Sequence, residues 1–126
     1  TALSYGEQRR VLIARALATG ARVLLLDEPT AALDLEQSLR LLELLGQLAS
    51  EGYAIVVVLH ALDDAIRHTD RTLLLHEGRV DQLGVSREVL SPETIRRVYG
   101  VVTEESAGLR FSLPTDTRAP GLEGTR

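Results

Sequence analysis

Apolar residues recur along the chain with two spacings, one helical and one continuous. Between Ser4 and Gly20 they return every three or four residues, which predicts an amphipathic helix. Residues 23–26 form a continuous apolar run of strand length, typical of a strand buried on both faces of a parallel sheet. Pro29 has no backbone N–H to donate to a neighbouring strand, so we expect the strand to end just before it.

The same alternation continues after Pro29. Leucines at helical spacing predict a second helix from Asp34 to near Gly52, and residues 53–59 form a second apolar, β-branched run with His60 at its end. Shorter elements are expected in this order: a helix at residues 63–68, strands at residues 72–76 and 79–82, and a helix at residues 91–99. Alternating helices and buried strands predict the α/β class, with helices on the faces of a mainly parallel sheet.

Composition divides the chain near residue 103. From there onward Thr, Gly, Glu, Arg and Pro are frequent, which favours a disordered tail over residues 103–126. Residues 1–102 are therefore expected to form the folded part.

Composition also excludes several classes of protein. The chain of 126 residues has a net charge of −4 and no cysteine, so it offers neither a basic surface for nucleic acid nor a disulfide or thiolate metal site. Its apolar runs are too short to span a bilayer and no signal peptide is recognisable, so we expect a cytoplasmic location. All 14 basic residues are arginines, so the lysine of a phosphate-binding P-loop is missing. Methionine is also missing, and we expect the chain to be a fragment of a longer reading frame.

The end of the first strand has the residues for metal-assisted phosphoryl chemistry. Asp27 can hold Mg²⁺ directly or through water, and Glu28 can polarise an attacking water. The alternative for these two residues alone is a solvated acidic turn after a buried strand.

The start of the first helix has the form of an anion site. Ser4 and Glu7 have the spacing of a capping box, and Gly6 lets the backbone approach a ligand. The alternative is an ordinary capped helix.

Four segments resemble, in the same order along the chain, motifs of ABC-type ATPases. LSYGEQ (residues 3–8) resembles the ABC signature LSGGQ, VLLLDEP (23–29) the Walker B strand, TAALD (30–34) the D-loop and VLH (58–60) the H-loop. The chain is thus similar to the C-terminal half of an ABC transporter ATP-binding subunit. This resemblance implies part of a P-loop NTPase-like domain, without the half that contains the P-loop.

The resemblance implies a role for each residue at the strand ends. Asp27 would serve Mg²⁺ and its water shell, Glu28 would be the general base, and His60 would contact the γ-phosphate of ATP. It also implies a dimer in which two ATP molecules lie between two subunits. Asp34 would reach across this dimer, and three residues of the signature would contact the ATP bound to the opposite subunit: Ser4, Gly6 and Glu7.

Two departures from the usual signature occur. Tyr5 stands where the first glycine is usual, and Glu7 replaces glutamine. We interpret Tyr5 as a tolerated variant, because the other motif residues are intact, and the alternative is a degenerate site. Glu7 in place of glutamine is a mild change. A signature with tyrosine is also similar to that of molybdate-type ATPases.

Later segments are similar to those of importer ATPases. LLHEGRV (residues 74–80) resembles their late hairpin, and VLSPETIRRVYGV (89–101) resembles the C-terminal helix of subunits that serve iron-siderophore, haem and cobalamin uptake. The resemblance implies an ATPase bound to the inner face of the cell membrane through permease subunits, with a substrate-binding protein as an indirect partner. The alternatives are a non-transport ABC ATPase of DNA repair or of the ribosome, and a truncated remnant. We expect the fragment alone to be inactive.

Overall fold

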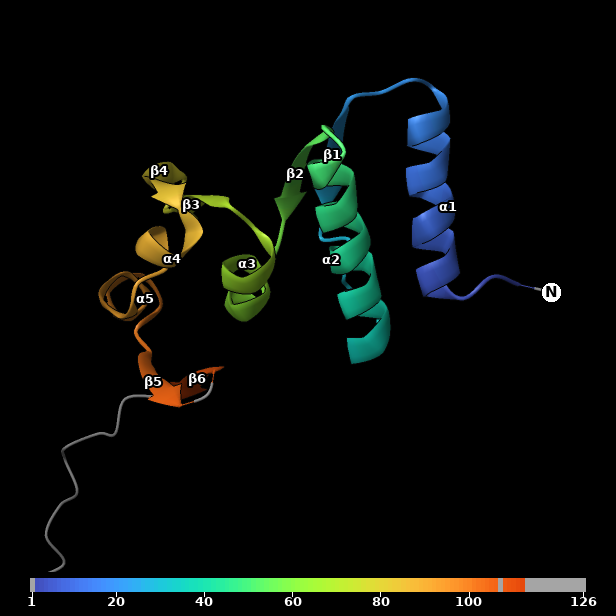
Figure 1. Ribbon diagram of the computed structural model, residues 1–126. Coiled ribbons are helices and arrows are strands. Elements are labelled where there is room, and N and C mark those ends of the chain that lie inside the picture. The colour runs from blue at the N-terminus through green and yellow to red at the C-terminus, as the bar shows by residue number, and fades with distance from the viewer. Residues whose placement is uncertain (1, 107, 113–126) are drawn as a thin grey trace, which may run out of the picture.

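The computed structural model describes residues 2–106 and 108–112. Its elements follow in this order: α1 (Tyr5–Ala18), β1 (Val23–Asp27), α2 (Leu35–Ser50), β2 (Ala54–Val58), α3 (Leu62–His68), β3 (Arg71–His76), β4 (Arg79–Val85), α4 (Ser86–Val89), α5 (Pro92–Tyr99), β5 (Val102–Ser106) and β6 (Gly108–Ser112) (Figure 1). The predicted α/β class is confirmed.

A parallel strand pair with two helices forms the first half of the fold. β1 and β2 run in parallel, from the pair Val23 and Ala54 to the pair Asp27 and Val58, and α2 connects them. Buried side chains of α1, α2 and β1 pack together in one cluster: Ile13, Leu24, Leu41, Leu45 and Leu48. The two helices therefore cover the same face of the strand pair (Figure 1).

The opposite face of this strand pair is open. Leu25 has 77% of its surface exposed, and Val23 and Val56 have 58% each. The prediction that the first strand is buried on both faces is therefore wrong for the part of the chain that the structure describes. The physical reason is that both helices pack on the face of Leu24, so only alternate residues of each strand are covered.

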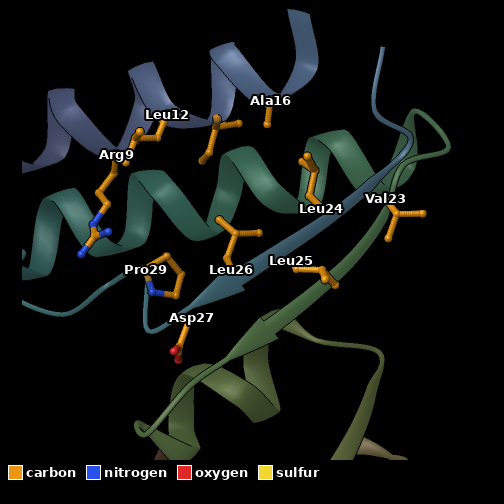
Figure 2. Close-up of a pocket in the computed structure, with 10 residues that line it drawn as sticks. Arg9, Leu12, Ala16, Val23, Leu24, Leu25, Leu26, Asp27 and Pro29 are labelled. Atoms are coloured by element: carbon orange, nitrogen blue, oxygen red, sulfur yellow. The ribbon is translucent and has the colours of Figure 1, made fainter. Parts of the chain in front are cut away.

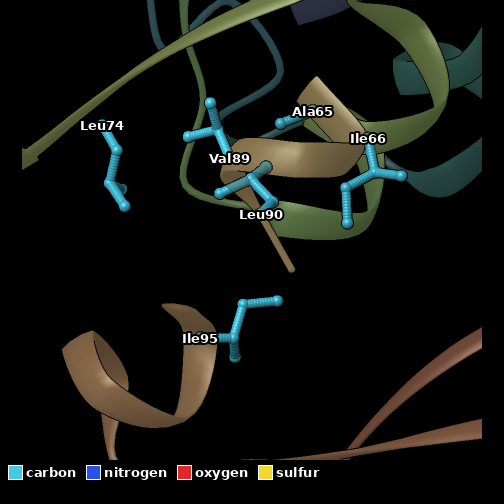
Figure 3. Packing of buried hydrophobic residues seen from close by; sticks show 6 residues of the cluster. All are labelled: Ala65, Ile66, Leu74, Val89, Leu90 and Ile95. Atoms are coloured by element: carbon cyan, nitrogen blue, oxygen red, sulfur yellow. The ribbon is translucent and has the colours of Figure 1, made fainter. Parts of the chain in front are cut away.

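A hairpin with three short helices forms the second half. β3 and β4 pair in antiparallel fashion, with a register shift between Leu74 and Leu75. Figure 3 shows the apolar cluster that holds this half together: Ala65, Ile66, Leu74, Val89, Leu90 and Ile95. Ile95 has no exposed surface, so α5 is anchored by its side chain.

The one-turn helix α4 is absent from the sequence prediction. Its first residue, Ser86, is 1% exposed, and its hydroxyl lies 2.7 Å from Oγ1 of Thr69 and 2.9 Å from Oγ1 of Thr72. Tertiary hydrogen bonds thus satisfy a buried polar side chain at this position. Such contacts join residues far apart in sequence, so hydrophobic spacing gives no sign of them.

The last helix follows its predicted start and end. The N–H of Thr94 donates to Oγ of Ser91 at 3.3 Å, and Gly100 takes the left-handed conformation with φ 68° after Tyr99. Arg97 donates two hydrogen bonds to the carboxylate of Asp81 on β4, at 2.8 and 2.6 Å. These bonds lower the pKa of Asp81 below its ordinary value.

The region after residue 102 differs from its prediction. We expected a disordered tail from Thr103, but β5 and β6 pair as an antiparallel hairpin, from Val102 opposite Ser112 to Ser106 opposite Gly108. Averaged composition hid a β-branched start of the segment, Val102 and Thr103. Residues 113–126 lie outside the described residues, so for them the tail stays a prediction.

The helices are short or carry many polar residues. Among those within residues 2–106 and 108–112, none has the length and apolar character needed to cross a bilayer.

Candidate functional site

Glu28 and His60 meet where the two parallel strands end. Asp27 and Val58 form the last residue pair of β1 and β2, so the residues that follow them emerge at the same edge. Nε2 of His60 lies 2.5 Å from Oε1 of Glu28, a hydrogen-bonding distance. The side chains are 78% and 45% exposed, respectively, so both are accessible to a ligand from solvent.

The backbone of Glu28 is held by the same segment. Its N–H donates to the carbonyl of Val58 at 3.0 Å, although Glu28 lies beyond the end of β1. Its φ of 47° is in the left-handed region, which is costly for a residue with a side chain. The Val58–His60 stretch of chain therefore fixes both the main chain and the carboxylate of Glu28.

Asp27 places a second carboxylate beside this pair. It is the last residue of β1 and is exposed. Among the residues that the structure describes, no group of three His, Cys, Asp or Glu side chains is arranged to hold a metal ion. Mg²⁺ is commonly held by one or two carboxylates together with water and substrate phosphates. A lone carboxylate such as Asp27 fits that mode of binding. The described residues do not offer a site made only of protein ligands.

A cavity of about 260 Å³ separates the first helix from the first strand. Figure 2 shows Arg9, Leu12 and Ala16 of α1 on one side, with Asp27 and Pro29 at its lower end. Arg9 is half-buried and lines this cavity. Arg9 of α1 and Pro29, which follows Glu28, thus line the same cavity.

The start of α1 has the capping box that the sequence predicts. The N–H of Glu7 donates to Oγ of Ser4 at 3.2 Å, and the N–H of Ser4 donates to Oε2 of Glu7 at 2.8 Å. The backbone N–H of Ser4 holds the pKa of the Glu7 carboxyl below its ordinary value. The hydroxyl of Ser4 thus accepts a hydrogen bond within the cap.

Tyr5 and Gly6 differ sharply in exposure. Tyr5 is 66% exposed at the first position of α1, whereas Gly6 is buried. The heavy atoms that a Cβ atom on Gly6 would approach most closely belong to Gln37 of α2. The sequence places Gln37 in the first turn of the second helix but predicts no further role for it, because a polar residue there gives no signal of a contact with another helix.

Asp34 caps the second helix. Its Oδ1 accepts a hydrogen bond from the N–H of Gln37 at 2.8 Å. Within the described residues, no hydrogen bond or ion pair joins Asp34 or Ser4 to the pair of Glu28 and His60. The structure thus brings the predicted residues together in two groups, one at the strand ends and one at the starts of α1 and α2.

The fold and this arrangement define a class of protein. Parallel strands that carry adjacent carboxylates and a histidine at their carboxyl ends, with helices on one face, form part of a P-loop NTPase-like α/β domain. Known proteins agree with this class. The family model described as "ABC transporter" matches residues 1–31.

Curated relatives cover almost all of the chain. It is 51% identical to the cobalamin import ATP-binding protein BtuD of Halobacterium salinarum, over 99% of the chain and 33% of the relative. It is 45% identical to the hemin import ATP-binding protein HmuV of Rhodococcus jostii, over 90% of the chain and 40% of the relative. It is 37% identical to the ferric enterobactin transport ATP-binding protein FepC of Escherichia coli, over 94% and 45%. The chain belongs to this family of ABC transporter ATP-binding subunits.

Solved structures support the same assignment. One solved structure is described as an inward-facing conformation of a putative metal-chelate type ABC transporter. It matches with a TM-score of 0.78 and 28% identity, over 90% of this chain and 49% of that one. The dimeric bacterial ABC transporter cassette MJ0796 matches with a TM-score of 0.58 and 38% identity, over 68% and 37%. The chain thus spans between a third and a half of the length of these relatives and solved structures.

Proposed function

We propose that this chain is part of the ATP-binding subunit of an ABC importer, which hydrolyses ATP to power uptake of a metal chelate or an oxyanion. The metal chelates we expect are iron-siderophore, haem or cobalamin. The observation that carries the proposal is the contact of 2.5 Å between His60 and Glu28 at the ends of parallel strands. The relatives are named as ATP-binding proteins of cobalamin import, hemin import and ferric enterobactin transport. These names favour transport over the non-transport alternatives.

Each residue at the strand ends has a part in hydrolysis. Glu28 accepts a proton from the attacking water, and His60 holds that water and contacts the γ-phosphate. Asp27 would hold Mg²⁺ through the water shell of the ion, and Mg²⁺ bound with ATP would neutralise charge on the phosphates. The exposure of Glu28 and His60 supports this proposal, because a ligand has access to both side chains.

The starts of the first two helices act on the opposite subunit of a homodimer. Ser4, Gly6 and Glu7 contact the γ-phosphate of ATP held mainly by the partner, and Asp34 reaches across the interface. An exposed helix start presents N–H groups that are suited to an anion. The dimeric form of the related cassette MJ0796 favours the same assembly.

The complete subunit attaches to the cytoplasmic face of two permease subunits. A substrate-binding protein delivers cargo to the permease, so it is an indirect partner. We expect no nucleic acid in this assembly, because the net charge of the chain is −4. The chain has no lysine, so we expect no ATP turnover from these 126 residues alone.

ATP turnover by the complete subunit tests this proposal. Glu28→Gln removes the base but keeps the size of the side chain, so we expect turnover to fall at least about 100-fold while ATP binding persists. Glu43→Gln, an exposed position in the middle of α2, serves as the matched control and should leave turnover unchanged. Normal turnover by the Glu28→Gln subunit would exclude Glu28 as the base.

A further inference from the structure

Gln37 fills the space where the first turns of α1 and α2 meet. A Cβ atom placed on Gly6 would lie 3.1 Å from Cδ of Gln37, 3.3 Å from its Oε1 and 3.4 Å from its Cγ. Carbon atoms in ordinary contact are about 3.5–4.0 Å apart. A side chain at residue 6 therefore has no room unless Gln37 moves.

This contact accounts for the burial of Gly6. Ser4, Tyr5 and Glu7 beside it are all exposed, and the three heavy atoms nearest to a Cβ atom placed on Gly6 belong to Gln37. The absence of a side chain at residue 6 is thus a requirement of helix packing inside this chain.

Gln37 is also tied to Asp34. Its N–H donates to the Asp34 carboxylate at 2.8 Å, which fixes the main chain of Gln37 in the first turn of α2. Its side chain then extends from this fixed point to Gly6. One half-buried residue therefore contacts two segments that both face the opposite subunit in the proposed function.

We propose that Gln37 is a positioning residue that sets the distance between the start of α1 and Asp34. This inference rests on the proposed function. Phosphate contacts by Ser4 and Gly6 and the reach of Asp34 across the dimer need one fixed spacing if they are to form together. Gln37 maintains that spacing by its length, since its Cγ and Cδ occupy the space beside Gly6, 3.4 and 3.1 Å from where a Cβ atom of residue 6 would lie. A shorter side chain lets the first turn of α1 settle toward α2 and moves its N–H groups away from the phosphate.

The test is dimerisation of the complete subunit, made in the Glu28→Gln background so that ATP is not consumed. The dissociation constant of the ATP-bound dimer is measured by sedimentation, and ATP affinity is measured on the dilute monomer. We expect Gln37→Ala to weaken dimerisation about tenfold or more, because displacements near 1 Å have effects of this order. ATP affinity of the monomer should stay the same. Gln37→Met, which keeps the length of the side chain, should restore dimerisation to within about twofold of the parent.

A double-mutant cycle separates packing from direct contact with the ligand. Gly6→Ala alone forces Gln37 to move, whereas in the Gln37→Ala background the new methyl group has room. The loss of dimerisation caused by Gly6→Ala should therefore be severalfold smaller in that background. The inference would be overturned if Gly6→Ala weakened dimerisation equally in both backgrounds. It would also be overturned if the Gln37→Ala subunit dimerised as strongly as its parent.

Three further outcomes bear on the inference. A Glu28→Gln parent that stays monomeric with ATP contradicts the proposed function itself, and with it the role of Gln37. If Gln37→Ala does not fold, Gln37→Asn removes one methylene instead of the whole amide and decides between the two outcomes above. A lowered melting temperature with unchanged dimerisation would assign Gln37 a purely structural role.

Discussion

His60 Nε2 and Glu28 Oε1 lie 2.5 Å apart, and this contact joins two residues 32 positions apart in sequence at the ends of β1 and β2. The carbonyl of Val58 makes a second link to the main chain of Glu28 at 3.0 Å. The placement of the acidic turn after β1 therefore depends on the segment after β2.

We predict that His60→Ala lowers ATP turnover by the complete subunit about 100-fold or more, because the γ-phosphate contact is lost and the Glu28 carboxylate loses its partner. Stability should change little, since 78% of the His60 side chain is exposed. Steady-state turnover and thermal unfolding measure the two effects. His76→Ala is the control, and an equal loss of turnover from it would contradict a specific role of His60.

The left-handed backbone of Glu28 predicts a conflict between stability and activity. Glycine adopts φ 47° without strain, so Glu28→Gly should raise the free energy of unfolding by about 0.5–1 kcal/mol while it abolishes turnover. Glu77 has a similar φ of 49° in the turn between β3 and β4. Glu77→Gly should give the same gain and retain turnover. Chemical denaturation and an ATPase assay compare the two variants, and the idea fails if Glu28→Gly is the less stable protein.

The ion pair of Asp81 and Arg97 predicts a dependence of stability on acid. Arg97 lowers the pKa of Asp81 in the folded chain, so the stabilisation is complete above the unfolded pKa near 3.8 and is lost as the pH falls through the folded pKa. Urea unfolding at pH 6 and at pH 3 measures this loss. Glu7 also has a lowered pKa and contributes in the same acid range. Asp81→Asn removes only the part of this pH dependence that is due to Asp81. If the free energy of unfolding falls between pH 6 and pH 3 by the same amount in Asp81→Asn as in the unaltered chain, this assignment is refuted.

Burial predicts effects of very different size for truncation of two apolar side chains. Ile95 of α5 is fully buried, so Ile95→Ala should lower the free energy of unfolding by about 2–5 kcal/mol. Leu25 is 77% exposed, so in this chain Leu25→Ala should change it by less than about 0.5 kcal/mol. Guanidinium unfolding of both variants compares them directly. Similar losses would mean that a further element covers Leu25.

Local sequence patterns predict much of this fold. The capping box of Ser4, the Pro29 stop and the glycine after Tyr99 act within a few residues, so the helices and strands that they bound are recognisable in advance. The motif resemblance places Glu28 and His60 in one site, and the structure brings them into contact.

The remaining features depend on contacts between distant residues. The helix α4 is stabilised by hydrogen bonds from Ser86 to Thr69 and Thr72. The contact of Gly6 with Gln37 arises only when α1 and α2 pack together. The open face of β1 was missed because a continuous apolar run has the same pattern whether one face or both faces are covered.

That open face has a consequence for handling the chain in solution. Val23, Leu25, Val56 and Val58 form an exposed apolar surface on the two paired strands. Exposed apolar sheet surfaces promote self-association and bind apolar dyes. The 126-residue chain should therefore increase the fluorescence of such a dye and form larger species as its concentration rises, and polar substitutions on this face should suppress both effects.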